Sequence, residues 1–495
     1  MTENLNSWIK NRIKEEEITK YMDSDKDFIN DDEIREKINN NQNPDSKRIR
    51  EIFDKALRIE TLSPDETAML INLKDTDLIE EMKEVALKVK LKVYDNRIVT
   101  FAPLYMGDYC VNNCLYCGFR TDNKVIKRRI LTEDEIRKET EVLAGKIGHK
   151  RLIVVYGEHP LTDVNYIENS LKTIYDVKVK VRSGFGQIRR ANVNAAPLQI
   201  EELKRLRDVG IGTYQVFQET YHHETYNQVH PKDTLKGHYK WRLYCMHRSL
   251  EAGVDDVGIG VLFGLYDWRF EVLAMLYHAI ELEKKFGIGP HTVSFPRLEP
   301  AANTPYINQT KYAVSDEDFE RIILVLRLAI PYTGMILTAR EPKHIRDKVM
   351  PYGITQTDAS TRIGIGAYSD RYTEQELERQ QFLIGDPRTL DELIRDLAKM
   401  GNITSFCTAG YRCGRTGKMI MDLLRTGKEG NYCKLNAITT FKEWLLDFAS
   451  EETAKIGNEL IERELNEVKE KLPKAYPVLK EYLDRIGNGE RDLYF

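Results

Sequence analysis

The sequence lacks a charge excess, a long apolar run and a leader for export. Its 74 lysine and arginine residues nearly balance 78 aspartate and glutamate residues, which gives a net charge of −4. A surface that binds polyanions usually carries a strong basic excess, so we expect no nucleic acid partner. No apolar run approaches the ~18 residues of a membrane span, and the N-terminus lacks the apolar core of a secretion signal. We therefore expect no membrane partner and a cytoplasmic protein.

Cysteine is also scarce. The chain has 7 in 495 residues, an odd number that is too small for a disulfide scaffold. Cys245 stands alone in a helical pattern and is expected to be a buried thiol. The others form two groups, which are Cys110, Cys114 and Cys117, then Cys407, Cys413 and Cys433. This grouping indicates inorganic ligation in a reducing compartment.

Short β-rich runs alternate with helical patterns from about residue 96. The runs are 98–107, 151–159, 177–186, 212–220, 255–264, 291–300, 334–342 and 355–364. Such alternation favours a closed (β/α)8 TIM-type barrel of the α/β class, although an open doubly wound sheet has the same periodicity.

Three parts are expected along the chain. Residues 1–95 form a helical N-terminal extension, 96–385 the barrel, and 386–495 a C-terminal helical domain with a possible second iron–sulfur site. Within the N-terminal part, Ser63 followed by Pro64 predicts the start of a helix.

The first cysteine group has the spacing C-x3-C-x2-C and directly follows the first predicted strand. Active sites of barrels lie at this end of the strands. Three thiolates on one loop can hold three irons of a 4Fe–4S cube and leave the fourth iron open to a cosubstrate. A structural zinc site is the alternative, but it would normally be closed by a fourth ligand, and no other Cys or His is near this loop in the sequence.

With Tyr116 before its last cysteine, this loop resembles the one that defines the radical S-adenosylmethionine (SAM) enzymes. The resemblance implies a 4Fe–4S cluster held by Cys110, Cys114 and Cys117, with SAM chelated at the open iron. A low-potential electron donor reduces the cluster, which cleaves SAM to a 5′-deoxyadenosyl radical that abstracts hydrogen. The cofactors supply the reactivity, and the protein supplies ligation, orientation and exclusion of water.

Polar residues at the predicted strand ends are candidates for binding SAM. Glu158, in the run YGEHP, is similar to the Gly-Glu element that binds the amino group of SAM in this family. Arg182 and Glu219 occupy the ends of the third and fourth predicted strands, and polar residues at strand ends commonly line the site of a barrel. The alternatives are a surface turn for Glu158 and structural hydrogen bonding for the other two.

Longer motifs sharpen the resemblance. QVFQETYHHETYNQVHP, GIGVLFGLYDWRFE, GPHTVSFPRLEPA, LTAREP and CTAGYRCGRTG closely resemble the HydG-type maturases of iron–iron hydrogenase, and less closely the thiazole-pathway tyrosine lyases. Both resemblances imply cleavage of the Cα–Cβ bond of L-tyrosine to p-cresol and dehydroglycine. In the maturases, dehydroglycine is converted further to CO and cyanide on a second cluster, and other hydrogenase maturation proteins are possible partners.

Three residues are candidates for holding the amino acid. Arg340, in LTAREP, offers a bidentate fork for a carboxylate. Thr361, with Ser360 beside it, resembles the neighbouring hydroxyl element of the family. The alternative for Arg340 is a salt bridge to Glu341 or to another acid at the barrel rim.

The C-terminal cysteines depart from the family pattern. The C-x2-C-x22-C motif of the second cluster falls on Cys407, Gly410 and Cys433, so its middle ligand is absent, and Cys413 stands three residues further on. His291 matches the histidine ligand to an extra iron at that cluster, or is an ordinary strand-end histidine.

Two outcomes stay open for this second site. Cys413 becomes the third ligand, or the cluster is missing and the chain stops at tyrosine cleavage, supplying dehydroglycine to thiazole synthesis or another pathway. The retained residues Arg412, Gly414, Arg415, Thr416 and Gly417, together with Cys433, favour a retained cluster. A non-catalytic iron–sulfur scaffold is the alternative from a different class, and the SAM-like elements at the strand ends argue against it.

Overall fold

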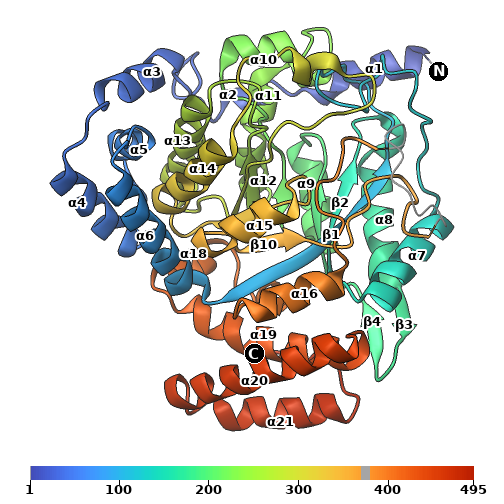
Figure 1. The fold of residues 1–495 in the computed structure, drawn as a ribbon. Helices are drawn as coiled ribbons and strands as arrows, with labels where there is room; N and C mark the ends of the chain where they lie inside the picture. The colour runs from blue at the N-terminus through green and yellow to red at the C-terminus, as the bar shows by residue number, and fades with distance from the viewer. Residues whose placement is uncertain (1, 370–379) are drawn as a thin grey trace.

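The centre of the chain is a closed parallel barrel, seen in a computed structural model that describes residues 2–369 and 380–495. β10 pairs with β1 and closes the barrel, as the alternation of strands and helices predicts (Figure 1). Around the barrel the strands are β1 (Arg97–Gly107), β2 (Arg151–Tyr156), β5 (Arg190–Asn194), β6 (Tyr214–Gln215), β7 (Val257–Gly260), β8 (Thr292–Ser294), β9 (Gly334–Leu337) and β10 (Gln356–Asp358).

Helices surround the barrel and extend it at both ends (Figure 1). Before β1 they are α1 (Thr2–Arg12), α2 (Glu16–Thr19), α3 (Asp31–Asn40), α4 (Ser46–Leu57), α5 (Pro64–Ile71) and α6 (Thr76–Tyr94). Among the barrel strands they are α7 (Glu133–Val142), α8 (Val164–Asp176), α9 (Ile200–Val209), α10 (His223–Val229), α11 (Tyr239–Leu243), α12 (Cys245–Glu251), α13 (Trp268–Phe286), α14 (Asp316–Ala329) and α15 (Lys343–Val349). After β10 they are α16 (Leu390–Lys399), α17 (Ala409–Arg412), α18 (Gly417–Arg425), α19 (Glu429–Asp447), α20 (Glu451–Lys471) and α21 (Tyr476–Gly487).

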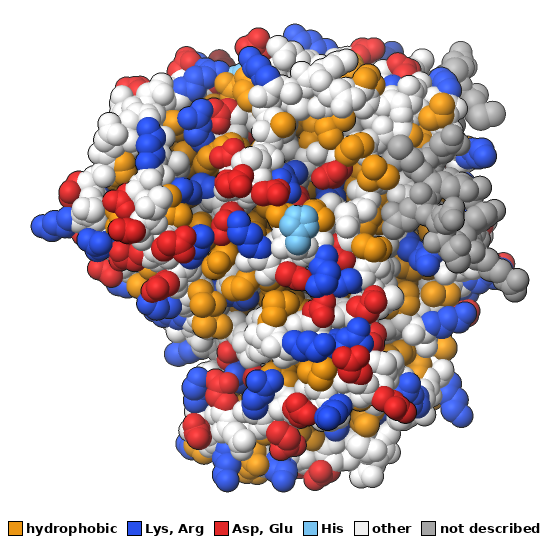
Figure 2. All heavy atoms as spheres, in the orientation of Figure 1, with side chains coloured by type: hydrophobic (Ala, Val, Ile, Leu, Met, Phe, Trp, Pro, Cys, Tyr) orange, Lys and Arg blue, Asp and Glu red, His pale blue; other side chains and the backbone are white. Residues whose placement is uncertain are grey.

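Acidic and basic side chains are interspersed over the face shown in Figure 2, in keeping with the small net charge. None of the described helices combines the length and the apolar character that crossing a membrane requires.

The predicted start of α5 is confirmed. The Ser63 hydroxyl accepts from the Glu66 backbone N–H, and Glu66 Oε2 accepts from the Ser63 N–H at 2.8 Å. This reciprocal capping box satisfies two backbone donors that a helix start leaves unpaired, and Pro64 fits there because its missing N–H is not needed.

The prediction for the third barrel strand was wrong. Residues 177–186 include β3 (Lys178–Lys180) and the start of β4 (Phe185–Gln187), which form an antiparallel hairpin outside the barrel. The barrel strand is β5, whose sequence RANVN has little apolar content. Alternation as in VKVKV is typical of a strand with one exposed face, and both lysines of β3 are exposed.

The N-terminal end of β1 pairs with one additional strand outside the barrel. Its first residues, Arg97 to Val99, pair in parallel with β11 (Ile403–Ser405) before its later residues pair with β2. The segment that leads to Cys407 is therefore hydrogen-bonded to the start of the first barrel strand. The predicted domain boundaries near residues 95 and 385 stay predictions.

A buried ion network joins α19 to the barrel. Glu443 is fully buried and lies 2.7 Å from Arg189 and 3.2 Å from Lys150. Burial alone would raise the pKa of Glu443, but attraction to Arg189 and then Lys150 lowers it to about 2. Burial instead lowers the pKa of Lys150 to about 8. Arg189 has the shorter contact, so we infer that it supplies most of the positive charge that balances Glu443.

Replacing Glu443 with glutamine is expected to lower the free energy of unfolding by about 3–5 kcal/mol, because Lys150 loses its counter-charge and Arg189 keeps only its ion pair with the half-exposed Asp492. The control E133Q breaks the exposed Arg137–Glu133 pair and should cost less than about 0.5 kcal/mol. Urea denaturation measures both. Because the folded pKa of Glu443 is depressed, the wild-type advantage is complete above pH 4.5 and shrinks as pH falls toward about 2. An unchanged midpoint for E443Q would show that the network contributes nothing.

Candidate active site

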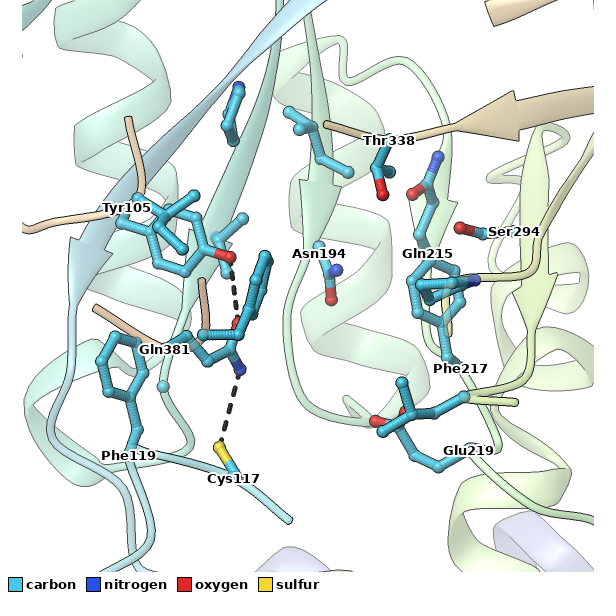
Figure 3. Close-up of a pocket in the computed structure, with 18 of the residues that line it drawn as sticks. Tyr105, Cys117, Phe119, Asn194, Gln215, Phe217, Glu219, Ser294, Thr338 and Gln381 are labelled. Atoms are coloured by element: carbon cyan, nitrogen blue, oxygen red, sulfur yellow. Dashed lines mark hydrogen bonds between the residues drawn. The ribbon is translucent and has the colours of Figure 1, made fainter. Parts of the chain in front are cut away.

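A cavity of about 240 Å³ opens at the carboxyl ends of the barrel strands (Figure 3). Eight residues that the sequence predicts as site residues line this cavity together. They are Cys110, Cys114, Tyr116, Cys117, Glu158, Glu219, Arg340 and Thr361. The parallel strands bring these side chains to one end because every strand points the same way.

Backbone hydrogen bonds fix the cysteine loop over the cavity. The Val111 N–H donates to the Glu158 carbonyl at 2.8 Å, and the Leu115 N–H to the Val229 carbonyl at 3.1 Å. Burial raises the pKa of Cys110, and it raises that of Cys114 to about 12. A metal group would have to displace these protons, because the thiolate is the ligand form.

The end of β2 brings Glu158 beside the cysteine loop. A Cβ on Gly157 would lie 2.1 Å from the Tyr109 carbonyl oxygen, so only glycine permits this close approach. Asn112 Nδ2 donates to Glu158 Oε2 at 2.5 Å, and Asn112 Oδ1 accepts from the Lys236 N–H at 2.8 Å. Asn112 therefore orients the carboxylate from within the cysteine loop.

Glu219 is held in a strained backbone conformation with φ +71°. Its Oε1 lies 2.7 Å from Lys236 Nζ and 3.6 Å from Arg242. Burial would raise the pKa of Glu219, but these two cations outweigh burial and lower it. Glu219 thus enters the cavity as a carboxylate that is already paired.

Two aromatic hydroxyls are fixed near the thiols. The Tyr116 hydroxyl pairs with His230 Nε2 at 2.8 Å. Tyr105 donates to Gln381 Oε1 at 2.9 Å, and Gln381 Nε2 lies 3.6 Å from Cys117 Sγ (Figure 3). These side chains fill the space around the loop and restrict its movement.

Arg340 makes no ion pair or hydrogen bond to any residue that the structure describes. Its guanidinium stacks on the Phe382 ring, 3.3 Å from the ring centroid, and burial lowers its pKa. Glu341 instead accepts from Arg297 Nε at 3.0 Å, so a salt bridge between Arg340 and Glu341 is excluded. A planar cation with its donors unused lies in the wall of the cavity.

Thr361 and Ser360 face different surroundings. The Thr361 hydroxyl lines the cavity and donates to Asp358 Oδ2 at 2.6 Å, while Asp358 Oδ1 accepts from the Ala339 N–H at 2.7 Å. The Ser360 hydroxyl accepts from the Leu390 N–H at 2.8 Å, outside the cavity lining. Ser360 therefore caps the start of α16 rather than joining its neighbour.

Arg182 is not among the cavity residues. It lies in the turn of the β3–β4 hairpin and donates to the Ala449 carbonyl at 3.2 Å. The expectation of a SAM contact here depended on the misplaced third strand and is corrected with it. The cavity residues that the sequence analysis missed include Asn112, Lys236 and Arg242. Only Asn112 carried a signal, since it lies inside the cysteine loop.

The remaining predicted ligands lie at the opposite end of the barrel. Cys407 follows β11, and Cys433 is buried on α19. His291 directly precedes β8 on the same side and lies 3.9 Å from Asp256, and burial lowers its pKa. Cys413 is exposed, and its Sγ lies 3.7 Å from the Phe495 carbonyl oxygen. In the described residues, no three His, Cys, Asp or Glu side chains converge on a single ion at either end.

Two protein-family models and one relative match this chain. The model of the radical SAM superfamily matches residues 104–276, and that of the biotin and thiamin synthesis associated domain matches 294–403. The 2-iminoacetate synthase of Salmonella typhimurium is 30% identical over 372 residues, covering 75% of this chain and 92% of the relative.

Two solved structures cover nearly the whole chain. A crystal structure of HydG, a maturase of the [FeFe]-hydrogenase, has 47% identity and a TM-score of 0.89, and covers 95% of this chain and 100% of that one. HydG from Carboxydothermus hydrogenoformans has 37% identity and a TM-score of 0.77, and covers 96% and 100%.

A radical SAM domain implies a 4Fe–4S cluster and SAM as cofactors. With the barrel, the loop of three cysteines and similarity over nearly the whole length, the chain belongs to the radical SAM superfamily, in the family of HydG and 2-iminoacetate synthase.

Proposed function

We propose that this enzyme is a lyase that cleaves the Cα–Cβ bond of L-tyrosine to p-cresol and dehydroglycine. The hydrogen atom removed from tyrosine leaves on 5′-deoxyadenosine, so a second electron from the low-potential donor and one proton are needed to complete p-cresol. The observation that carries the proposal is the unpaired guanidinium of Arg340 in the same cavity as the three thiols and Glu158. A half-buried guanidinium with unused donors is completed by an anionic partner, and the carboxylate of an amino acid supplies one.

The cavity residues fit the cofactors of the superfamily. Cys110, Cys114 and Cys117 would hold the cluster, since all three line one cavity. Glu158, fixed by Asn112, would accept hydrogen bonds from the ammonium of SAM. When reduced by a low-potential donor, the bound pair supplies one-electron cleavage of a sulfonium and a radical that abstracts hydrogen.

The protein's task is then to hold tyrosine in one orientation. The stacking of Arg340 on Phe382 leaves the edge of the guanidinium free for a bidentate carboxylate. Because the Thr361 hydroxyl already donates to Asp358, its lone pairs point elsewhere and can accept from the substrate's amino group. The paired Glu219 adds no uncompensated charge.

A second candidate is a lyase that releases dehydroglycine without making CO and cyanide. Gly410 cannot ligate iron, and Cys413 faces Phe495, and both observations favour it. Conversion to CO and cyanide, with hydrogenase maturation proteins as partners, needs a working second cluster. A CO-trapping assay on the reconstituted enzyme separates these two functions.

Anaerobic reaction with SAM, tyrosine and a reductant should give p-cresol and 5′-deoxyadenosine, which chromatography quantifies. C114A should lose both products, because one iron of the cluster would lose its thiolate. C413A is the matched control and should keep both, since this thiol is exposed and far from the cavity. SAM cleavage without p-cresol would contradict tyrosine as substrate, and neither product would favour the iron–sulfur scaffold.

R340A should lower kcat/KM for tyrosine by about 10²- to 10³-fold, because a bidentate, charge-assisted contact is lost. R340K should recover only part of this, since an ammonium cannot form the fork. Steady-state p-cresol formation measures the loss. R205K is the control and should match wild type, since Arg205 of α9 only forms a surface ion pair with Glu168 of α8. Equal activity of R340A and wild type would remove Arg340 from the substrate site.

A further inference from the structure

The two thiols at the base of the barrel belong to elements that meet there. Cys407 follows β11 with φ +47°, a conformation that non-glycine residues rarely adopt and that redirects the chain directly after the strand. Cys433 lies on α19, which packs against β11. Arg97, the first residue of β1, pairs with Ile403 of β11 and so lies at the same junction.

Arg97 is a buried cation with no hydrogen bond to any described residue. Arg97 is only 5% exposed, and its Nε has no hydrogen-bond partner. The centre of its guanidinium lies 5.1 Å from the centroid of the Tyr94 ring. Arg97 lies where β1 pairs with β11, the strand that leads to Cys407, and α19, which carries Cys433, packs against the same strand. A buried cation without an acceptor points to a bound anionic group beside the two thiols.

Glu429 offers a third donor to the same space. It lies one turn before Cys433 on α19, so both side chains share one face of the helix. Cys433 Sγ is 3.4 Å from Glu429 Oε1. The second oxygen, Oε2, is buried without a hydrogen bond, and its closest cation is Arg415 Nε at 3.6 Å. The carboxylate therefore has unused acceptor capacity next to a thiol.

Arg415 connects the backbone of Gly410 with this carboxylate. The Arg415 N–H donates to the Gly410 carbonyl at 2.9 Å, and the same arginine approaches Glu429. A Cβ on Gly410 would meet nothing closer than 3.8 Å, so no side chain fills that position and a thiol could be added. The Cys413 thiol instead lies 3.7 Å from the Phe495 carbonyl oxygen.

We propose that Glu429 is the third protein ligand, with Cys407 and Cys433, of an iron–sulfur cluster at the base of the barrel. It replaces the thiol that Gly410 cannot supply. Oxygen and nitrogen ligands can substitute for cysteine at such clusters, as histidine does at Rieske centres. Arg97 would lie beside the cluster and offset its negative charge. The inference rests on the proposed function only in assuming an iron–sulfur enzyme, and its test needs no turnover.

The test uses the full chain with Cys110, Cys114 and Cys117 all changed to alanine, so that reconstituted iron reports on the base alone. This parent should retain about four irons and sulfides per chain and give a cluster EPR signal after reduction. Adding E429Q should lower retained iron roughly tenfold or more. Adding C413A, the control, should leave iron and signal unchanged.

Rescue distinguishes ligation from a folding defect. E429C should keep the iron and shift the EPR signal, because sulfur replaces oxygen. G410C should restore iron to the E429Q chain, because it returns a thiol to the open position. The proposal is overturned if the parent retains no iron, if E429Q retains it fully, or if C413A loses it. Loss of iron with H291A but not with E429Q would assign the third ligand to His291. Since no variant here cleaves SAM, failure of this inference leaves tyrosine cleavage untouched.

Discussion

The pairing of β10 with β1 is the constraint on which the functional site depends. Only a closed ring of parallel strands brings the loop after β1, the end of β2 and the segment after β9 to one opening. The cysteines and Arg340 are separated by more than two hundred residues, yet they line one cavity. Gly157 refines this placement, because a larger residue would hold β2 away from the cysteine loop.

Unbalanced buried charge marks the places where ligands belong. Most buried cations of this chain have partners, as Arg189 has in Glu443 and Arg297 has in Glu341. Arg340 and Arg97 have no such partner among the described residues, and they lie at opposite ends of the barrel. Anionic groups bound at the two ends of the barrel would complete these two guanidinium groups.

The barrel and the residues of the active-site cavity could largely be predicted from the sequence, because the sequence patterns that indicate them are local. The cysteine loop, YGEHP and LTAREP each combine a strand end with an unusual residue. The third strand could not be predicted, because β5 is polar in sequence and is buried only by its neighbours, whereas the β3–β4 hairpin alternates clearly. Arg182 was misassigned for this reason. Lys236 and Ser360 depend on tertiary contacts that no local pattern records.

The long first strand explains why the two ends can evolve separately. β1 runs from Arg97, which pairs with the strand that leads to Cys407, to Gly107, three residues before Cys110. Its 11 residues span roughly 33 Å at the usual rise per residue, a distance at which two unit charges interact by only about 0.5 kcal/mol at an effective dielectric constant of about 20. Loss of a thiol at position 410 therefore alters the base without perturbing the charges that orient an amino acid above. Whether the chain stops at dehydroglycine is decided at the base alone, by which side chain completes the coordination there.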